Sequence, residues 1–109
     1  MPETIRITMA VAQVLAALCD DPSAQRYGLE LIRATGQPSG TIYPILTRLQ
    51  RAGWVEASWE QVDPAEQGRP ARRYYRLTPD GVVSARVELA ALRQRLSRAA
   101  GSHEPRQAW

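Results

Sequence analysis

Apolar residues in the first part of the chain recur at steps of three and four, which is the spacing of amphipathic helices. The first such stretch follows Thr8, whose hydroxyl can cap a helix, and it ends at Cys19. A second helix is predicted to start at Asp21, which precedes a proline, or at Ser23, and to end at Thr35. The pattern therefore predicts two helices before the first glycine stop signal.

A third helix follows directly, because Gly36 to Pro38 leaves a connection of only about three residues. Ser39 or Thr41 can cap it, and Gly53 ends it. If Thr41 is the cap, Pro44 costs no backbone hydrogen bond; if Ser39 is the cap, one bond is lost or bent. Its apolar stripe consists of Ile42, Ile45, Leu46 and Leu49. Two helices joined by so short a turn predict a helix-turn-helix unit.

The period of the pattern changes to two after this third helix, which predicts β-strands. Polar and apolar residues alternate over 55–60 and again over 71–77, and a polar loop joins the two segments over 61–70. A hairpin with a long tip follows from this arrangement. Such a hairpin, directly after a helix-turn-helix unit, predicts a winged helix.

A long final helix is predicted from the start signal Thr78-Pro79-Asp80 to Gly101. Its apolar residues alternate steps of three and four, a coiled-coil type of seam, and they are Val82, Ala85, Leu89, Leu92, Leu96 and Ala99. An exposed seam of this kind favours a second copy of the chain as partner. The alternative is that the helix folds back onto its own domain and pairs with the first helix, and both can hold in part.

The predicted fold class is thus mainly α with a small β-hairpin, an α+β winged helix-turn-helix. We expect the DNA-binding domain to span residues 1–78, a C-terminal dimerisation helix to span 79–100, and a flexible tail to span 101–109.

Charge placement adds a candidate partner to this fold. All fourteen basic residues are arginine, and the net charge is +3. Residues 39–55 hold two arginines and no acid, and residues 67–76 hold four arginines and no acid. Arginine suits the planar recognition of phosphates and base edges. A genomic bias toward arginine codons explains the total as well, but it does not explain the local absence of acids.

Other classes of protein fit the composition poorly. The one cysteine and the one histidine exclude a disulfide within the chain, a multi-cysteine zinc site and the usual catalytic pairs. No apolar run approaches the roughly 20 residues of a membrane span, and no secretory signal precedes the first helix. We therefore expect a cytoplasmic protein without metal, cofactor, membrane contact or enzymatic activity.

The polar face of the third helix and the wing supply the candidate DNA contacts. On the helix these are Ser39, Gly40, Thr41, Tyr43, Thr47, Arg48 and Arg51, and on the wing they are Arg69, Arg72 and Arg73. Arg48 has the planar donors that read guanine, and the first turn offers free N–H groups to a phosphate. Arg69, at the wing tip, suits the narrow minor groove. A solvated face is the simpler interpretation, and Asp63 and Glu66 in the same loop favour it.

Four further residues have a structural and a functional interpretation. Cys19 ends an apolar stripe and is expected to be a buried, inert thiol. Trp54 and Trp59 flank the first strand and are expected to pack in the core or hairpin, the alternative being a flat aromatic ligand site at a dimer seam. Tyr27 fits a phosphate contact and core packing equally well.

Specific segments resemble the PadR family of bacterial winged-helix transcriptional regulators. They are Tyr27-Gly28-Leu29-Glu30-Leu31, Pro38-Ser39-Gly40-Thr41-Ile42-Tyr43-Pro44-Ile45-Leu46-Thr47-Arg48-Leu49, Gly53-Trp54-Val55 and Gly68-Arg69-Pro70-Ala71-Arg72-Arg73-Tyr74-Tyr75-Arg76-Leu77-Thr78. The resemblance runs colinearly over roughly residues 8–85. It implies a homodimeric repressor that binds a palindromic operator and is often released by a small molecule. It also implies that Ser39, Gly40, Thr41 and Tyr43 begin the recognition helix.

The leading hypothesis is a dimeric, sequence-specific DNA-binding repressor. The chain has one helix after the wing, so a separate ligand-binding domain like that of longer family members is not expected. The alternative function is a winged-helix adapter that binds proteins and not DNA, because the fold alone does not fix the function. The acid-free third helix favours DNA over the adapter.

Overall fold

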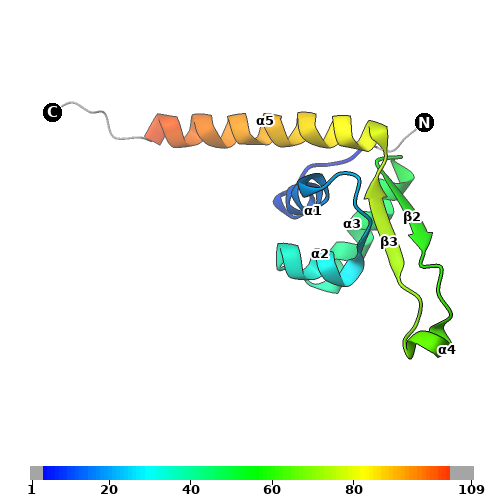
Figure 1. Cartoon of the computed structure of the whole chain (residues 1–109). Coiled ribbons are helices and arrows are strands. Elements are labelled where there is room, and N and C mark those ends of the chain that lie inside the picture. The colour runs from blue at the N-terminus through cyan, green and yellow to red at the C-terminus, as the bar shows by residue number, and fades with distance from the viewer. Residues whose placement is uncertain (1–3, 104–109) are drawn as a thin grey trace.

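The computed structural model describes residues 4–103 and arranges them as helices around a small sheet, with one long helix across one end (Figure 1). The elements in chain order are α1 (Met9–Asp20), β1 (Arg26–Tyr27), α2 (Gly28–Thr35), α3 (Ser39–Arg51), β2 (Val55–Trp59), α4 (Pro64–Gln67), β3 (Arg73–Leu77) and α5 (Pro79–His103). The predicted class, a mainly helical winged helix-turn-helix with a long C-terminal helix, is confirmed.

The first helix forms as predicted, and the second starts later than predicted. The Thr8 hydroxyl caps α1 by accepting the Val11 N–H at 3.1 Å. The prediction that the second helix starts at Asp21 or Ser23 is wrong, because residues 21–24 form a turn and residues 26–27 form β1. Helix α2 starts only at Gly28, where the Tyr27 N–H donates to the Glu30 carboxylate at 3.1 Å.

The turn between α2 and α3 has the predicted three residues. Gly36 takes a left-handed conformation (φ 71°) and its N–H donates to the Ile32 carbonyl, which ends α2. The cap of α3 is Pro38, so neither Ser39 nor Thr41 caps this helix. Pro44 lies inside α3 and has no N–H to donate to the carbonyl four residues earlier, yet the helix continues to Arg51.

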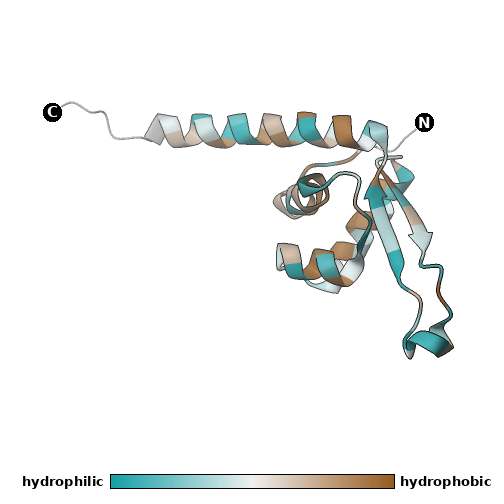
Figure 2. Cartoon of the chain, in the orientation of Figure 1, coloured by the Kyte–Doolittle hydropathy of each residue, from teal (hydrophilic) through white to brown (hydrophobic). Residues whose placement is uncertain are grey.

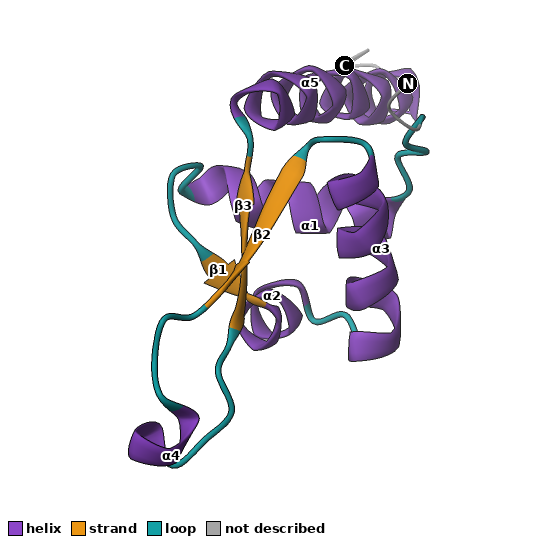
Figure 3. Ribbon diagram, turned by 90° about the vertical axis from the view of Figure 1, so that its right-hand side faces the viewer, coloured by secondary structure: helices purple, strands orange, loops and turns teal. Residues whose placement is uncertain are grey.

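The sheet has three antiparallel strands in the order β1-β3-β2 (Figure 3). The predicted hairpin is present, with Val55 opposite Leu77 and Trp59 opposite Arg73, but its second strand starts at Arg73 and not at residue 71. The third strand, β1, was not predicted. The loop at the tip contains the short helix α4, which was not predicted either, because the segment is polar and has no apolar periodicity. Asp63 before Pro64 is nevertheless an ordinary helix start signal, and Gly68 is an ordinary stop signal.

Helix α5 is anchored at its start and projects at its end. The Thr78 hydroxyl caps α5 by accepting the Gly81 N–H at 2.9 Å, as predicted. Ala85 is fully buried in the chain's own core, and Val82 and Leu89 pack against that core beside α1. The intramolecular alternative therefore holds for the first half of this helix.

The second half of α5 extends beyond the body of the molecule (Figure 1). Residues 93–100 are all exposed, and the Leu96 side chain is 52% exposed. Apolar and polar bands alternate along the whole helix, including the projecting part (Figure 2). The helix continues through Gly101 to His103, so the predicted stop at Gly101 is wrong, and the rest of the predicted tail lies outside the described residues.

Candidate nucleic-acid interface

Helix α3 buries one face and presents a polar face along its whole length. Ile42, Ile45, Leu46 and Leu49 are buried in the core, as their spacing predicted. On the opposite side Tyr43, Thr47 and Arg51 follow one another at steps of four and are all exposed. Arg48 is exposed on the flank of this row. The structure thus brings the predicted contact residues of α3 to one accessible surface.

The N-terminal turn of α3 is open and free of acids. No side chain caps it, and the backbone N–H groups of Thr41 and Ile42 both donate to the Pro38 carbonyl, at 2.9 and 3.0 Å. Ser39 and Gly40, whose N–H groups precede those bonds, are exposed. Exposed N–H groups at the positive end of a helix of thirteen residues suit a phosphate.

Tyr43 is fixed by a close approach between α3 and α2. Its ring and hydroxyl lie against Gly28, the first residue of α2, in the space that a β-carbon at residue 28 would need. The side chain is nevertheless 44% exposed. Gly28 therefore sets the position of an exposed tyrosine on α3, a role that its place in the sequence did not reveal.

The other polar side chains of α3 differ in how freely they can bind a ligand. The Thr47 hydroxyl donates to the Tyr43 carbonyl at 3.0 Å, so its oxygen remains available as an acceptor and its methyl group for apolar contact. Arg48 and Arg51 lie in the last turn, where their charge also suits the negative end of the helix.

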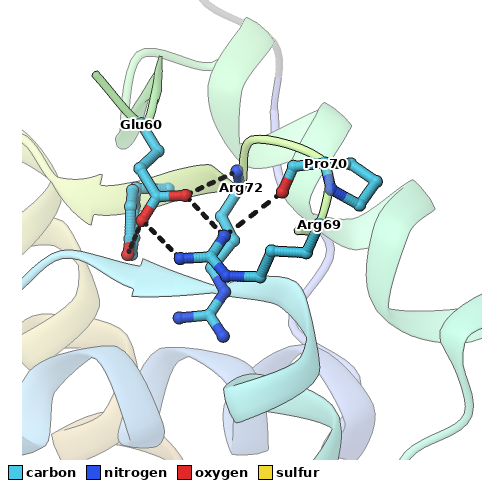
Figure 4. A network of polar contacts seen from close by, with 5 residues as sticks. Glu60, Arg69, Pro70 and Arg72 are labelled. Carbon is cyan, nitrogen blue, oxygen red and sulfur yellow. Dashed lines mark hydrogen bonds and ion pairs between the residues drawn. The ribbon is translucent and has the colours of Figure 1, made fainter. Parts of the chain in front are cut away.

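The wing has an internal polar network that holds its base together (Figure 4). The Glu60 carboxylate accepts hydrogen bonds from both terminal nitrogens of Arg69, at 2.7 and 3.0 Å. It also accepts the backbone N–H of Arg72 at 3.1 Å and the Tyr74 hydroxyl at 3.4 Å. The hydrogen bonds from Arg69 lower the pKa of Glu60 to about 2. Arg69 is therefore engaged by the protein and does not extend from the tip.

The two other arginines predicted to contact DNA from the wing lie over aromatic rings. The Arg72 guanidinium carbon is 4.2 Å from the centre of the Tyr27 ring, and that of Arg73 is 5.0 Å from the centre of the Trp59 ring. Tyr27 in turn meets Tyr74 edge to face, with ring centres 6.0 Å apart. Tyr27 thus packs against the wing, whereas its neighbour Gly28 packs against α3.

The predicted packing of both tryptophans is confirmed, whereas the role of Glu60 was not predicted. Trp54 packs against the core, and Trp59, which is 57% exposed, packs within the hairpin under Arg73 of the paired strand. Glu60 had no signal in the sequence except its negative charge shortly before the basic segment 69–76. Cys19 is half-buried against the core, and burial raises the pKa of its thiol, as expected of an inert cysteine.

Comparison with known proteins assigns the chain to a family. The profile of the transcriptional regulator PadR-like family matches residues 14–87, which include α3 and the whole wing. The chain belongs to the PadR-like family of transcriptional regulators. It is therefore a DNA-binding regulator and not an enzyme. No protein with a curated description matches it in sequence.

Solved structures of similar proteins agree on the fold. A PadR-like transcription factor from Bacteroides fragilis is 24% identical over 88% of this chain and 90% of its own, with a TM-score of 0.67. A PadR family regulator from Clostridium difficile is 17% identical over 87% of this chain and 97% of its own, with a TM-score of 0.68. BpsR from Bordetella bronchiseptica is 21% identical over 92% of this chain and 65% of its own, with a TM-score of 0.70.

The part of this PadR-like protein that the structure describes has neither a membrane-spanning helix nor a cluster of metal-binding side chains. Within residues 4–103, no helix has the length and apolar character needed to cross a membrane. Over the same residues, no three histidine, cysteine, aspartate or glutamate side chains come together where they could hold a metal ion.

Proposed function

We propose that this PadR-like protein is a dimeric repressor that reads a palindromic operator through α3. The observation that carries the proposal is the exposed, acid-free face of α3, which combines an open N-terminal turn with Tyr43, Thr47, Arg48 and Arg51. A helix of this kind fits the major groove of DNA, where the side chains on its exposed face can reach the base edges.

Each group on this face has a role that suits its chemistry. The first turn, with Ser39, Gly40 and Thr41, binds a phosphate and so fixes the register of the helix. Arg48 reads a guanine through two parallel hydrogen bonds. On the wing, Arg72 and Arg73 lie close enough to the body to meet the phosphate backbone beside the groove.

A second copy of the chain completes the proposed regulator. The projecting half of α5 carries Leu96, and the half-buried Leu92 precedes it on the same seam. The chain's own domain covers the first half of the seam, whereas the exposed Leu96 offers an apolar side chain to a partner. A twofold dimer places two copies of α3 about one helical turn of DNA apart, which explains why a palindrome is expected.

The test is fluorescence anisotropy with the DNA upstream of the protein's own gene and with a scrambled duplex of equal length, over a series of salt concentrations. We expect an advantage of about a thousandfold or more for the upstream DNA and a steep salt dependence. Equal and weak binding to both duplexes would contradict an operator at this site. No binding at low salt would favour the alternative, an adapter that binds proteins.

We also propose that a small molecule releases the protein from its operator in the cytoplasm. The support is a structural neighbour, BpsR, whose DNA binding is regulated by 6-hydroxynicotinic acid. A panel of small aromatic acids, added to the preformed complex, is expected to include a compound that lowers the anisotropy. A panel without effect on the complex would argue against effectors of this chemical class.

A further inference from the structure

We propose that Glu60 is a positioning residue that fixes the wing, and that Arg69 acts as its partner and not as a DNA contact. Glu60 follows β2 directly, and Arg69 lies nine residues later, beyond α4. Their paired hydrogen bonds, 2.7 and 3.0 Å long, therefore join the two ends of the wing-tip segment 61–68 (Figure 4).

The carboxylate of Glu60 is well suited to this role because it joins several parts of the wing. Its side chain is only 13% exposed, and that of Arg69 is 31% exposed. It also binds the Arg72 N–H, while the Glu60 N–H donates to the Arg72 carbonyl at 2.8 Å. Arg72 then lies over Tyr27, the residue that precedes α2. One carboxylate thereby ties the wing to the body that carries α3.

The charges at the tip argue against a minor-groove contact there. Residues 61–68 contain Asp63 and Glu66 and no basic residue. Asp63 caps α4 by accepting the Ala65 N–H at 2.9 Å, and Glu66 is exposed. Because Glu60 neutralises Arg69, the tip presents net negative charge, which DNA repels. The positive groups that remain near DNA are Arg72 and Arg73 at the wing base.

The inference rests on the proposed function only where it concerns DNA, so one part of its test uses no DNA. Amide exchange measured by NMR reports the bond between the Arg72 N–H and the Glu60 carboxylate. Glu60→Gln, Arg69→Gln and Arg69→Lys should each speed exchange of that amide by about tenfold, since each removes the paired charged hydrogen bonds. Glu66→Gln, which removes the same charge from the same loop, is the matched control and should leave the rate unchanged.

The double variant Glu60→Gln with Arg69→Gln completes this part of the experiment. It should exchange no faster than the more affected single variant, because the two residues act as one unit. A wild-type exchange rate of the Arg72 amide in Arg69→Lys and Glu60→Gln would overturn the inference.

The second part measures DNA binding on the upstream and scrambled duplexes over the same salt series. If Arg69 is a partner of Glu60, the slope of DNA affinity against salt concentration is the same in Arg69→Gln as in the wild type. Arg69→Lys then binds DNA with the same affinity as Arg69→Gln. If Arg69 contacts DNA, Arg69→Gln lowers the slope by about 1 and Arg69→Lys keeps the wild-type affinity, and the inference is wrong. A wild-type protein that prefers neither duplex would contradict the proposed operator binding, while the exchange rates would still decide the role of Glu60.

Discussion

Two neighbouring residues at the start of α2 connect α3 and the wing, the two parts of the proposed DNA-binding surface. Tyr27 contacts the wing through Arg72 and Tyr74, whereas Gly28 lies against the ring of Tyr43 on α3. The start of α2 therefore sets where the wing and α3 lie relative to each other. This explains in physical terms why a tyrosine and a glycine are adjacent here.

A methyl group at residue 28 should disturb DNA binding more than folding. In Gly28→Ala the new β-carbon meets the far end of the Tyr43 side chain, which can move away, so the fold survives. We expect DNA affinity to fall about fivefold, or about 1 kcal/mol. In a Tyr43→Ala background the same substitution should cost no further affinity. Additive losses in the double variant would show that Gly28 acts by another route.

The Glu60 carboxylate should stay ionised far into the acid range. Its pKa is about 2, below the ordinary value of 4.5, because Arg69 donates two hydrogen bonds to the charged form. The stabilising effect on the wing is thus fully present above about pH 4.5 and is lost as the pH falls through about 2. An NMR titration of the carboxyl carbon should give this midpoint, and Arg69→Gln should raise it. A wild-type midpoint near 4.5 would contradict the observed pairing.

Sequence patterns located the side chains of α3 better than those of the wing. The helical period of about 3.6 residues is enough to place four apolar residues on the buried face of α3 and the polar residues on the exposed face. The buried residues are Ile42, Ile45, Leu46 and Leu49. The pairing of Glu60 with Arg69 depends on the path of a loop, which the pattern does not encode. An arginine at a glycine-proline turn therefore suggested a free cation where the structure has a paired one.

Helix α5 joins the winged domain where Thr78 and Gly81 meet the backbone of Gly53 and Trp54. The Thr78 N–H donates to the Trp54 carbonyl at 3.0 Å, and the Thr78 hydroxyl donates to the Gly53 carbonyl at 2.7 Å. Gly81, in the first turn of α5, lies so close to the Trp54 carbonyl that a β-carbon has no room. The direction in which α5 leaves the sheet is fixed here.

Gly81→Ala should destabilise the protein even though alanine is the better helix former. The helical preference is worth about 1 kcal/mol in favour of alanine. The overlap is with backbone, which cannot move aside, and such overpacking costs about 1–3 kcal/mol, so a net loss in the free energy of unfolding is expected. Gly101→Ala, at a helical position with open space around it, is the control. Urea unfolding that finds both variants as stable as the wild type would contradict the close approach.

The elements that the sequence failed to predict are short or depend on distant partners. Strand β1 has two residues and exists because it pairs with β3, more than forty residues later. Helix α4 has four residues, too few for a periodic pattern. The longer elements α1, α3 and α5 could be predicted because their periodicity extends over ten or more residues, and α1 and α5 also start at a capping threonine.

At the scale of the whole molecule, the body covers only part of the apolar seam of α5, and a second copy of the chain could cover the rest. The body covers the apolar seam of α5 up to Leu89, and the exposed Leu96 lies on the same seam in the projecting half. Leu96→Asp should therefore weaken the proposed dimer without unfolding the monomer, by about 2 kcal/mol or more, because it places a charge where the proposed interface would bury an apolar side chain. Gln94→Asp introduces the same charge on the opposite side of the helix and should keep the dimer.

Sedimentation equilibrium of both variants and the wild type measures this effect. A dimer as stable in Leu96→Asp as in Gln94→Asp would move the interface elsewhere, with the exposed Val83 and Val87 as the next surface to test.

Protection of guanine N7 from methylation by dimethyl sulfate tests most directly whether α3 reads the major groove. We expect wild-type protein on its upstream DNA to protect two clusters of guanines, related by a dyad and about ten base pairs apart. Arg48→Ala should lose one protected guanine in each cluster and keep the others. Unprotected guanines in a duplex that the protein binds tightly and specifically would contradict the placement of α3 in the major groove.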